Sequence, residues 1–365
     1  FTSILLFSAC NQPQDSERQT TPATTSAELV DDAEQIVDAD PESATDESES
    51  VSTSVSLPLL QLELPLHWTA MLLDPEDALA LPVADRGAVM ALSAERAVSA
   101  KLPRIQIGAA RRWIKKEFEA ISKDCGGCLE VFYQRNLVKA SENDRITEDV
   151  WVVNVIAVQR GKKHPNRYIM MSGDIDSRVS DPNNATSDSP GANDNASGMA
   201  GTIEAARVLS KYSFDNSVVY AGLSGEEQGL FGGRGLAAYA KENNWNLIGV
   251  MNNDMIGNTT GVDGVVSNRD FRIFSEPVPP TETERERRSR RFYGGEVDGI
   301  SRQLARYVHR TTQTYMPEMN PMLIYRLDRF GRGGHHRPFN DAGYAGIRIM
   351  VAHENYTQQH QDIRM

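Results

Sequence analysis

The sequence contains no apolar run as long as the roughly 18 residues that a membrane-spanning helix needs, so no such helix is predicted. Cysteine is also scarce. The 365 residues contain three cysteines, at positions 10, 125 and 128, and three thiols cannot form a four-cysteine zinc site. A transmembrane protein and a cysteine-bound structural zinc domain are therefore not expected.

An excess of positive charge is missing as well. The formal net charge is −12, but residues 1–57 alone contain twelve acidic side chains and one basic one. The rest of the chain is therefore nearly neutral. A nearly neutral body cannot attract polyanions through bulk charge, so we expect no nucleic-acid partner.

An apolar stretch at residues 1–9 precedes Cys10. It is typical of the end of a signal peptide, and its last residues, Leu-Phe-Ser-Ala-Cys, resemble a bacterial lipobox. We therefore interpret residues 1–10 as a partial signal peptide and expect a lipid on Cys10 to anchor the protein to a membrane. The expected location is the periplasm or the outer membrane. An ordinary secretory signal and a piece of a buried helix are the alternatives.

Residues 11–57 contain no aromatic residue and no glycine, and are rich in Ser, Thr and acidic residues. Such a segment buries too little apolar surface to fold, and its like charges extend it, so we predict a disordered tether. Residues 58–100 are interpreted as an N-terminal extension and residues 101–365 as the main domain. In an exported protein, Cys125 and Cys128 of the Cys-Gly-Gly-Cys motif most simply form a disulfide, with a redox motif as the alternative.

The main domain alternates between strand and helix patterns. Apolar residues at helical spacing (Ile107, Ala110, Ile114, Phe118, Ile121) predict an amphipathic helix. Strands are expected at 129–133, 150–158, 167–172, 218–223, 248–254 and 347–351, and helices at 197–211, 230–241 and 300–311. This order predicts a three-layer α/β fold with a mainly parallel, twisted sheet flanked by helices. The charged run at 282–291 is interpreted as a solvated loop or helix face.

Acidic residues follow three of the expected strands. Asp174 and Asp176 follow the strand at 167–172, and Glu226 and Glu227 follow the strand at 218–223. Asp254 ends the strand at 248–254. The carboxyl ends of parallel strands form one ligand-binding edge, so these side chains should lie together. A further acid, Asp194, lies in a Gly-rich loop before a helix. So many carboxylates would repel one another unless divalent metals neutralise them, although helix capping is an alternative role for each.

Three segments resemble family 28 of the metallopeptidases: Gly191-Ala-Asn-Asp-Asn-Ala-Ser-Gly198, Ser224-Gly-Glu-Glu-Gln-Gly-Leu230 and Asn253-Asp-Met-Ile-Gly257. That family contains aminopeptidases and glutamate carboxypeptidases, and glutaminyl cyclases share its fold. The resemblance covers roughly residues 100–365. It implies a zinc exopeptidase-like fold and two co-catalytic divalent metals, usually zinc.

The resemblance also implies residue roles. Asp194 would bridge the two metals, Glu227 and Asp254 would each bind one, and Glu226 would act as the general base. The last ligand would be a histidine near the C-terminal end, for which His360 fits best and His353 competes. The segment Gly333-Gly-His-His-Arg-Pro-Phe339 resembles the family's Asp-His-x-Pro-Phe motif, so His336 would contact the substrate or be merely a buried histidine.

The chain departs from the family pattern at two points. Asp174 stands where the family has the histidine of a His-x-Asp motif, whose second acid, here Asp176, orients that ligand. We expect Asp174 to remain a metal ligand, which gives the site one nitrogen ligand, His360, and four carboxylates, so Mn²⁺ or Co²⁺ could compete with zinc. The chain also stops five residues after His360, where family domains continue, so we expect a domain that is incomplete at its C-terminus.

These features predict a metal-dependent exopeptidase acting on peptides, most simply an aminopeptidase, because an acidic metal site can hold a free α-amine. A carboxypeptidase would need a cation for the terminal carboxylate, and Arg178, Arg329, Arg332 and Arg337 lie near the motifs. A glutaminyl cyclase-like acyltransferase is a further alternative. A catalytically impaired binding lipoprotein is the last alternative, because Asp174 replaces the usual histidine.

Overall fold

The computed structural model describes residues 106–142, 144–184, 186–187, 189, 191–293 and 295–362. The expectations for the signal peptide, the lipid on Cys10, the tether and the N-terminal extension therefore lie outside the described residues. Among the helices that are described, none is both long and apolar enough to cross a membrane.

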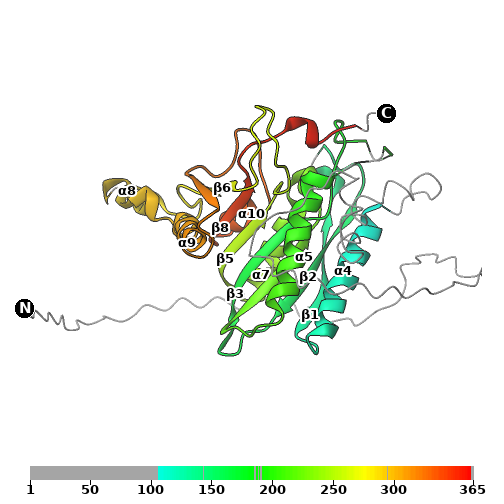
Figure 1. The fold of residues 1–365 in the computed structure, drawn as a ribbon, viewed down its shortest axis with the longest axis horizontal. Helices are drawn as coiled ribbons and strands as arrows, with labels where there is room; N and C mark the ends of the chain where they lie inside the picture. Colours follow the sequence, from blue (N-terminus) through cyan, green and yellow to red (C-terminus); the bar gives the residue numbers. More distant parts are fainter. Residues whose placement is uncertain are drawn as a thin grey trace, which may run out of the picture. The chain divides into compact units, whose positions relative to one another are not determined.

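An eight-stranded sheet forms the middle layer, in the order β1-β2-β4-β3-β5-β8-β6-β7 (Figure 1). The strands are β1 (Leu129–Val138), β2 (Val150–Gln159), β3 (His164–Asp174), β4 (Asn216–Leu223), β5 (Asn246–Asn253), β6 (Asp270–Ser275), β7 (Asn320–Ile324) and β8 (Gly346–Val351). The adjacent strands β4, β3, β5 and β8 are parallel. The expected mainly parallel α/β fold is confirmed, with antiparallel pairs between β1 and β2, β2 and β4, and β6 and β8.

Helices cover this sheet. They are α4 (Gln106–Asp124), α5 (Ser197–Leu209), α6 (Glu226–Gly229), α7 (Phe231–Glu242), α8 (Glu284–Tyr293), α9 (Ile300–Tyr315) and α10 (His336–Asp341). Helix α4 packs on β1 and β2, α5 on β3, β4 and β5, and α9 on β6, β7 and β8. Figure 1 shows α4 near one edge of the sheet and α8 and α9 near the other.

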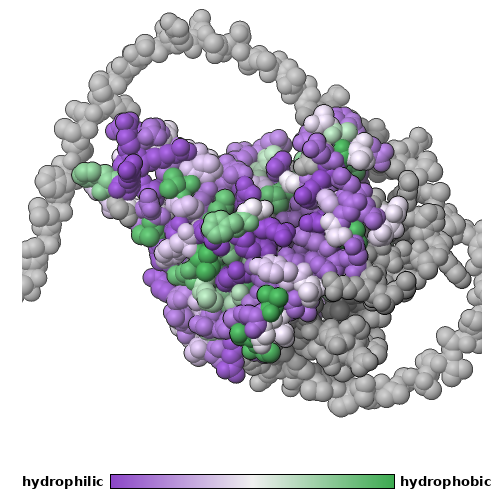
Figure 2. All heavy atoms as spheres, turned by 90° about the horizontal axis from the view of Figure 1, so that it is seen from above, coloured by the Kyte–Doolittle hydropathy of each residue, from purple (hydrophilic) through white to green (hydrophobic). Residues whose placement is uncertain are grey.

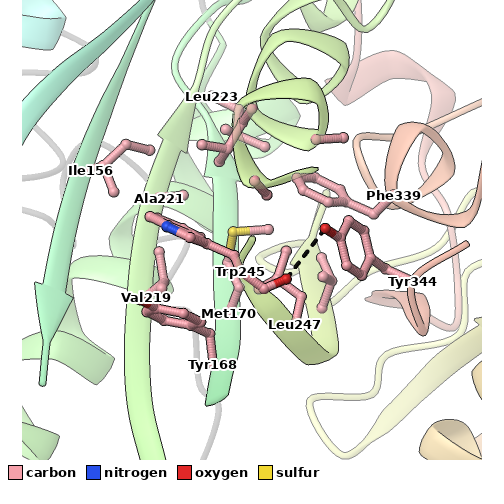
Figure 3. Packing of buried hydrophobic residues seen from close by; sticks show 14 of the residues in the cluster. Ile156, Tyr168, Met170, Val219, Ala221, Leu223, Trp245, Leu247, Phe339 and Tyr344 are labelled. Carbon is pink, nitrogen blue, oxygen red and sulfur yellow. Dashed lines mark hydrogen bonds between the residues drawn. The ribbon is translucent and has the colours of Figure 1, made fainter. Parts of the chain in front are cut away.

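One half of the core lies between the sheet and helices α7 and α10 (Figure 3). Tyr168 of β3 stacks on Trp245, with ring centroids 4.6 Å apart. The hydroxyl of Tyr344 donates to the carbonyl oxygen of Trp245 at 3.3 Å. Phe339 of α10 is fully buried in the same cluster. These contacts fix α10, and with it His335 and His336, against the sheet.

The other half of the core contains α4 and α5. The expected apolar face of α4 is buried at Ala110, Ile114, Phe118 and Ile121, in one cluster with residues of α5. Between α4 and β1 the predicted disulfide joins Cys125 and Cys128, whose Cα atoms are 5.6 Å apart. The amphipathic pattern therefore identified this layer correctly.

Strands β6 and β7 were not expected. Pro321 lies in β7, the last strand of the sheet, and proline is tolerated at an edge because an edge strand need not donate every backbone hydrogen bond. The charged run forms α8, which has no buried residue, so the predicted solvated face is confirmed. Figure 2 shows one face of the molecule as mostly hydrophilic, with hydrophobic residues in small separate patches.

Two glycines bring the start of α5 against the strands. A Cβ atom on Gly173 of β3 would lie 2.4 Å from the backbone nitrogen of Met199, and one on Gly198 would lie 2.1 Å from the carbonyl oxygen of Asn253. Real Cβ atoms do not approach backbone so closely. The loop before α5, which carries Asp194, therefore lies directly over the ends of β3 and β5.

We predict that Gly198→Ala destabilises the protein by roughly 1–3 kcal/mol, because the new methyl group must push α5 away from β5. Urea unfolding measures the change. A Cβ on Gly295 would meet nothing closer than 3.6 Å, so Gly295→Ala is the matched control. We expect the control to stay within about 0.5 kcal/mol of the parent. Equal effects from both substitutions would contradict the close approach.

Candidate functional site

Three strands end at one level of the sheet. In the register of β3 and β4, Asp174 is paired with Leu223, and in that of β3 and β5, Ser172 is paired with Asn252. The residues that follow these ends, Glu226 and Asp254 among them, are therefore brought to one edge together with Asp174. This is the arrangement that the positions of the acids in the sequence predicted.

Asn195 links the loop to the strands. Its Nδ2 donates to Asp174 Oδ2 at 2.6 Å and to the carbonyl oxygen of Asn253 at 2.9 Å. Its Oδ1 accepts from the backbone N–H groups of Gly198 at 3.1 Å and Met255 at 3.0 Å. All of these contacts are buried, so Asn195 fixes the position of its neighbour Asp194. Sequence reasoning missed this role, although an amide between acidic motifs was a usable signal.

Asp194, Glu227 and His360 form a group with the spacing of metal ligands. His360 Nε2 is 2.9 Å from Asp194 Oδ2 and 2.9 Å from Glu227 Oε1. Within the described part of the chain, this is the one cluster of at least three such side chains whose ligand atoms all lie close together. An imidazole nitrogen and two carboxylate oxygens are ligands that zinc accepts.

The structure separates the two histidines that competed for the last ligand position. His360 lies in the group, whereas His353 is 3.1 Å from Asp263 through its Nδ1 and 3.6 Å from Asp270 through its Nε2. The position of His353 beside these two acids therefore makes it a poor candidate for the site.

Arg178 lies behind two of the grouped side chains. Its Nε donates to Glu227 Oε2 at 2.9 Å, and its Nη2 is 2.8 Å from His360 Nδ1. A hydrogen bond of this kind to a carboxylate, as to Glu227, orients a metal ligand. Arg329 is likewise ion-paired, to Glu354 at 2.6 Å. Two of the four arginines considered for a carboxypeptidase therefore already have carboxylate partners.

Asp176 places the two adjacent glutamates. Its Oδ1 accepts from the backbone N–H of Glu226 at 3.2 Å, and its Oδ2 accepts from that of Glu227 at 3.1 Å. Burial raises the pKa of Asp176 to about 6. Burial, and then the charges of Glu227 and Asp254, raise the pKa of Glu226 well above its ordinary value. Asp176 is therefore a positioning residue for the proposed base.

Asp174 and Asp254 lie outside the group of three and contact protein cations or hydrogen-bonding groups. Asp174 Oδ1 is 2.5 Å from His335 Nδ1, and Asp254 Oδ2 is 2.9 Å from Arg348 Nη2. Of the five predicted ligands, three are therefore brought together with metal-ligand spacing. Sequence reasoning missed His335 and Arg348. A single arginine in the apolar strand β8 was a signal, because such a residue needs a buried counterion.

His336 is completely buried, and its Nε2 is 2.7 Å from the carbonyl oxygen of Leu327. Burial lowers its pKa to about 4, so the ring is neutral near pH 7. A Cβ on Gly334 would lie 3.1 Å from Asp254 Oδ2 and 3.2 Å from His336 Nδ1. His336 Nδ1 is thus directed to the region of Asp254, and contact with a substrate stays a prediction.

Without a metal ion, protons stabilise this edge. Burial opposes protonation of His360, but hydrogen bonds to Asp194 and Glu227 raise its pKa to about 9. Burial raises the pKa of Asp174 to about 7. A divalent cation bound by Asp194, Glu227 and His360 would replace the proton of His360, and its charge would favour the ionised form of Asp174, so metal binding should release protons.

We predict that zinc raises the melting temperature more at about pH 8 than at about pH 6. The folded-state pKa of Asp174, about 7, lies above its ordinary 3.8, so stability without metal falls as the pH rises between these values. The raised pKa of His360 has the same sign, since its stabilisation is lost as the pH rises toward about 9. Zinc relieves the loss at His360 by replacing its proton and the loss at Asp174 by placing positive charge near the carboxylate.

Scanning fluorimetry in EDTA and in a zinc buffer measures these increments at both pH values. Glu227→Gln should lose most of the zinc increment, because it removes a ligand. An increment in the parent that is independent of pH would contradict the displacement of protons.

The chain is similar to known peptidases. The model of peptidase family M28 matches residues 154–363. A probable zinc metalloprotease of Pyrenophora tritici-repentis is 37% identical over 257 residues, which are 70% of this chain and 59% of the relative. A probable zinc metalloprotease of Leptosphaeria maculans is 41% identical over 258 residues, 71% of this chain and 59% of the relative. The chain thus spans less than two thirds of the length of these relatives.

Solved structures support the fold. LapB from Legionella pneumophila superimposes with a TM-score of 0.50 at 14% identity, covering 82% of this chain and 68% of that one. The LapA aminopeptidase of the same species gives a TM-score of 0.50 at 17% identity, covering 78% of this chain and 66% of that one. With the family match and the fungal relatives, these findings show that the chain belongs to peptidase family M28.

Proposed function

We propose that this protein is a metal-dependent aminopeptidase, which removes N-terminal residues from peptides. The observation that carries the proposal is the group of Asp194, Glu227 and His360 at the sheet edge, with Glu226 beside Glu227 in sequence. The names of the fungal relatives support zinc proteolysis, and the name of LapA supports aminopeptidase action.

The group fits one zinc ion by its donor chemistry. It offers one imidazole nitrogen and two carboxylates, and catalytic zinc sites commonly have three protein ligands with a further position for water. Arg178 donates to Glu227 Oε2, so this ligand is oriented before a metal arrives. When bound, zinc would polarise a water molecule and the carbonyl of the scissile bond.

Glu226 moves the proton in this mechanism. Glu226 is a partly exposed residue, whereas Glu227 is buried, so the two neighbours can serve different purposes. As the base, Glu226 takes a proton from the attacking water and delivers it to the leaving amine. Asp176 holds the backbone of both residues, so the base keeps its position relative to the ligand Glu227.

Charge at the site favours a free amine at the end of the substrate. Asp194 and Glu226 are partly exposed, and the other acidic side chains lie around them, so an ammonium group would be attracted. A terminal carboxylate would need a cation, and Arg178 and Arg329 are already ion-paired. This distribution supports an aminopeptidase over a carboxypeptidase.

We predict turnover of aminoacyl anilides and of peptides with a free N-terminus, but not of the same peptides with an acetylated N-terminus. Release of aniline or of the first residue is measured with Zn²⁺, Mn²⁺ or Co²⁺ added. Equal hydrolysis of blocked peptides would exclude an aminopeptidase. Ring closure of N-terminal glutamine with release of ammonia would instead indicate a cyclase, and no turnover with intact metal binding would indicate a binding protein.

In the same assay Glu226→Gln should lower kcat by roughly 10²–10⁴-fold, because the amide cannot accept the proton. Zinc content should be unchanged, since Glu226 lies outside the ligand group. Glu242→Gln, at an exposed acid of α7, is the matched control and should keep the activity of the parent. Full activity of Glu226→Gln would remove this residue from the mechanism.

We also propose that the protein is exported and carries a lipid on Cys10, from the lipobox-like sequence that precedes this residue. The lipid would attach the protein to a membrane. Intact-mass measurement of the mature protein expressed in a bacterial host tests this proposal. The expected N-terminus is Cys10 with a diacylglycerol mass added, and a mature N-terminus without that mass would refute the anchor.

A further inference from the structure

Two residues at this site are exchanged relative to the motifs that the chain resembles. Asp174 stands at the histidine of the His-x-Asp motif. In the segment that resembles Asp-His-x-Pro-Phe, His336 stands at the histidine, so His335 stands at the aspartate. The chain therefore has an acid in place of a histidine at one position and a histidine in place of an acid at the other.

The exchanged residues contact each other. His335 Nδ1 lies 2.5 Å from Asp174 Oδ1, and both side chains are buried almost completely, at 0% and 1% exposure. The second oxygen of Asp174 accepts the hydrogen bond from Asn195 at 2.6 Å. Both oxygens of Asp174 are thus bound to protein groups. The two residues that are exchanged relative to the sequence motifs are also in contact with each other in the structure.

Asp254, the other predicted ligand outside the group of three, is already paired with a protein cation. Arg348 Nη2 is 2.9 Å from Asp254 Oδ2, and Nη1 of the same arginine donates to both oxygens of Asp328 at 2.9 and 3.0 Å. Arg348 is completely buried. A fixed guanidinium beside Asp254 supplies positive charge at the point where a second metal ion would otherwise be needed, and it would repel such an ion.

His335 does not restore a second ligand set. Its Nε2 is buried without a hydrogen-bond partner, its Nδ1 contacts Asp174, and the charge of Asp176 also acts on the ring. A metal on Nε2 would need other donors within about 4 Å, because each metal–ligand bond is about 2 Å long. Among the described residues, Asp194, Glu227 and His360 form such a group, with ligand atoms all within 4.8 Å of one another, and His335 belongs to no group of this kind.

We propose that the centre binds a single metal ion, through Asp194, Glu227 and His360, and that Arg348 and His335 occupy the surroundings of the second metal implied by the family resemblance. Asp174 and Asp254 are then structural partners of protein groups instead of ligands. This inference rests on the same site as the proposed peptidase, but not on turnover of any substrate.

Metal content tests the proposal directly. The full chain is dialysed against a zinc buffer, and zinc per chain is measured by inductively coupled plasma mass spectrometry. We expect one zinc per chain for the parent, and two for the double variant Asp174→His with His335→Asp, which reverses the exchange. Two tightly bound zinc ions in the parent would overturn the proposal. His353→Gln, at a histidine outside the group, is the control and should keep one zinc.

Two isosteric variants identify the ligands without relying on the double variant. Glu227→Gln should weaken zinc binding by more than the roughly 10–100-fold that is typical when only a partner of a ligand is lost, because it removes a ligand itself. The loss of zinc affinity in Asp254→Asn should be at least tenfold smaller than that in Glu227→Gln, because the carboxylate that Asp254→Asn removes is a partner of Arg348. A competition titration with a chromogenic chelator measures both. Equal losses from the two variants would show that Asp254 is a ligand and would overturn the proposal.

The electron paramagnetic resonance spectrum of the parent with Mn²⁺ reports whether two ions are adjacent. We expect the six-line signal of an isolated ion, and a spin-coupled pair would overturn the proposal. All of these measurements are made without substrate. A protein that binds one metal and hydrolyses nothing would support this inference and refute the proposed peptidase. An active protein with a coupled metal pair would refute this inference and support the proposed peptidase.

Discussion

Repulsion among buried carboxylates is the constraint that organises this molecule. Six acidic side chains (Asp174, Asp176, Asp194, Glu226, Glu227, Asp254) meet at one edge of the sheet, and most of them are buried. Each must be neutralised by a proton, a protein cation or a metal ion. The raised pKa values of Asp174 and Glu226 and the buried Arg348 are three results of this one requirement.

The scaffold holds these charges in place with backbone and amide contacts. Gly173 and Gly198 let α5 touch the strands, and Asn195 then joins two strand ends and the helix through four hydrogen bonds. Asp176 does the same for the short helix α6. Such contacts fix the separations between the charged groups. The repulsion between the carboxylates is therefore strongest at the sheet edge, where a bound cation can offset it.

Much of the fold could be predicted from sequence, because hydrophobic periodicity and strand-end acids reflect local chemistry. The amphipathic face of α4 and the parallel strands β4, β3, β5 and β8 followed from that pattern. The contacts of Asp174 with His335 and of Asp254 with Arg348 could not be predicted, since each joins segments about 100 or more residues apart. No local pattern records which buried histidine or arginine meets which acid.

The location of His360 has a mechanical consequence. Its segment is joined to the rest of the domain by Arg178 and by the hydrogen bond of Ser180 to Asp362 at 2.6 Å. A metal ion shared by Asp194, Glu227 and His360 would act as a cross-link that closes a chain loop of more than a hundred residues. The ion would then add a further link between the segment that carries His360 and the sheet, so metal binding would couple the chemistry of the site to the local stability of this segment.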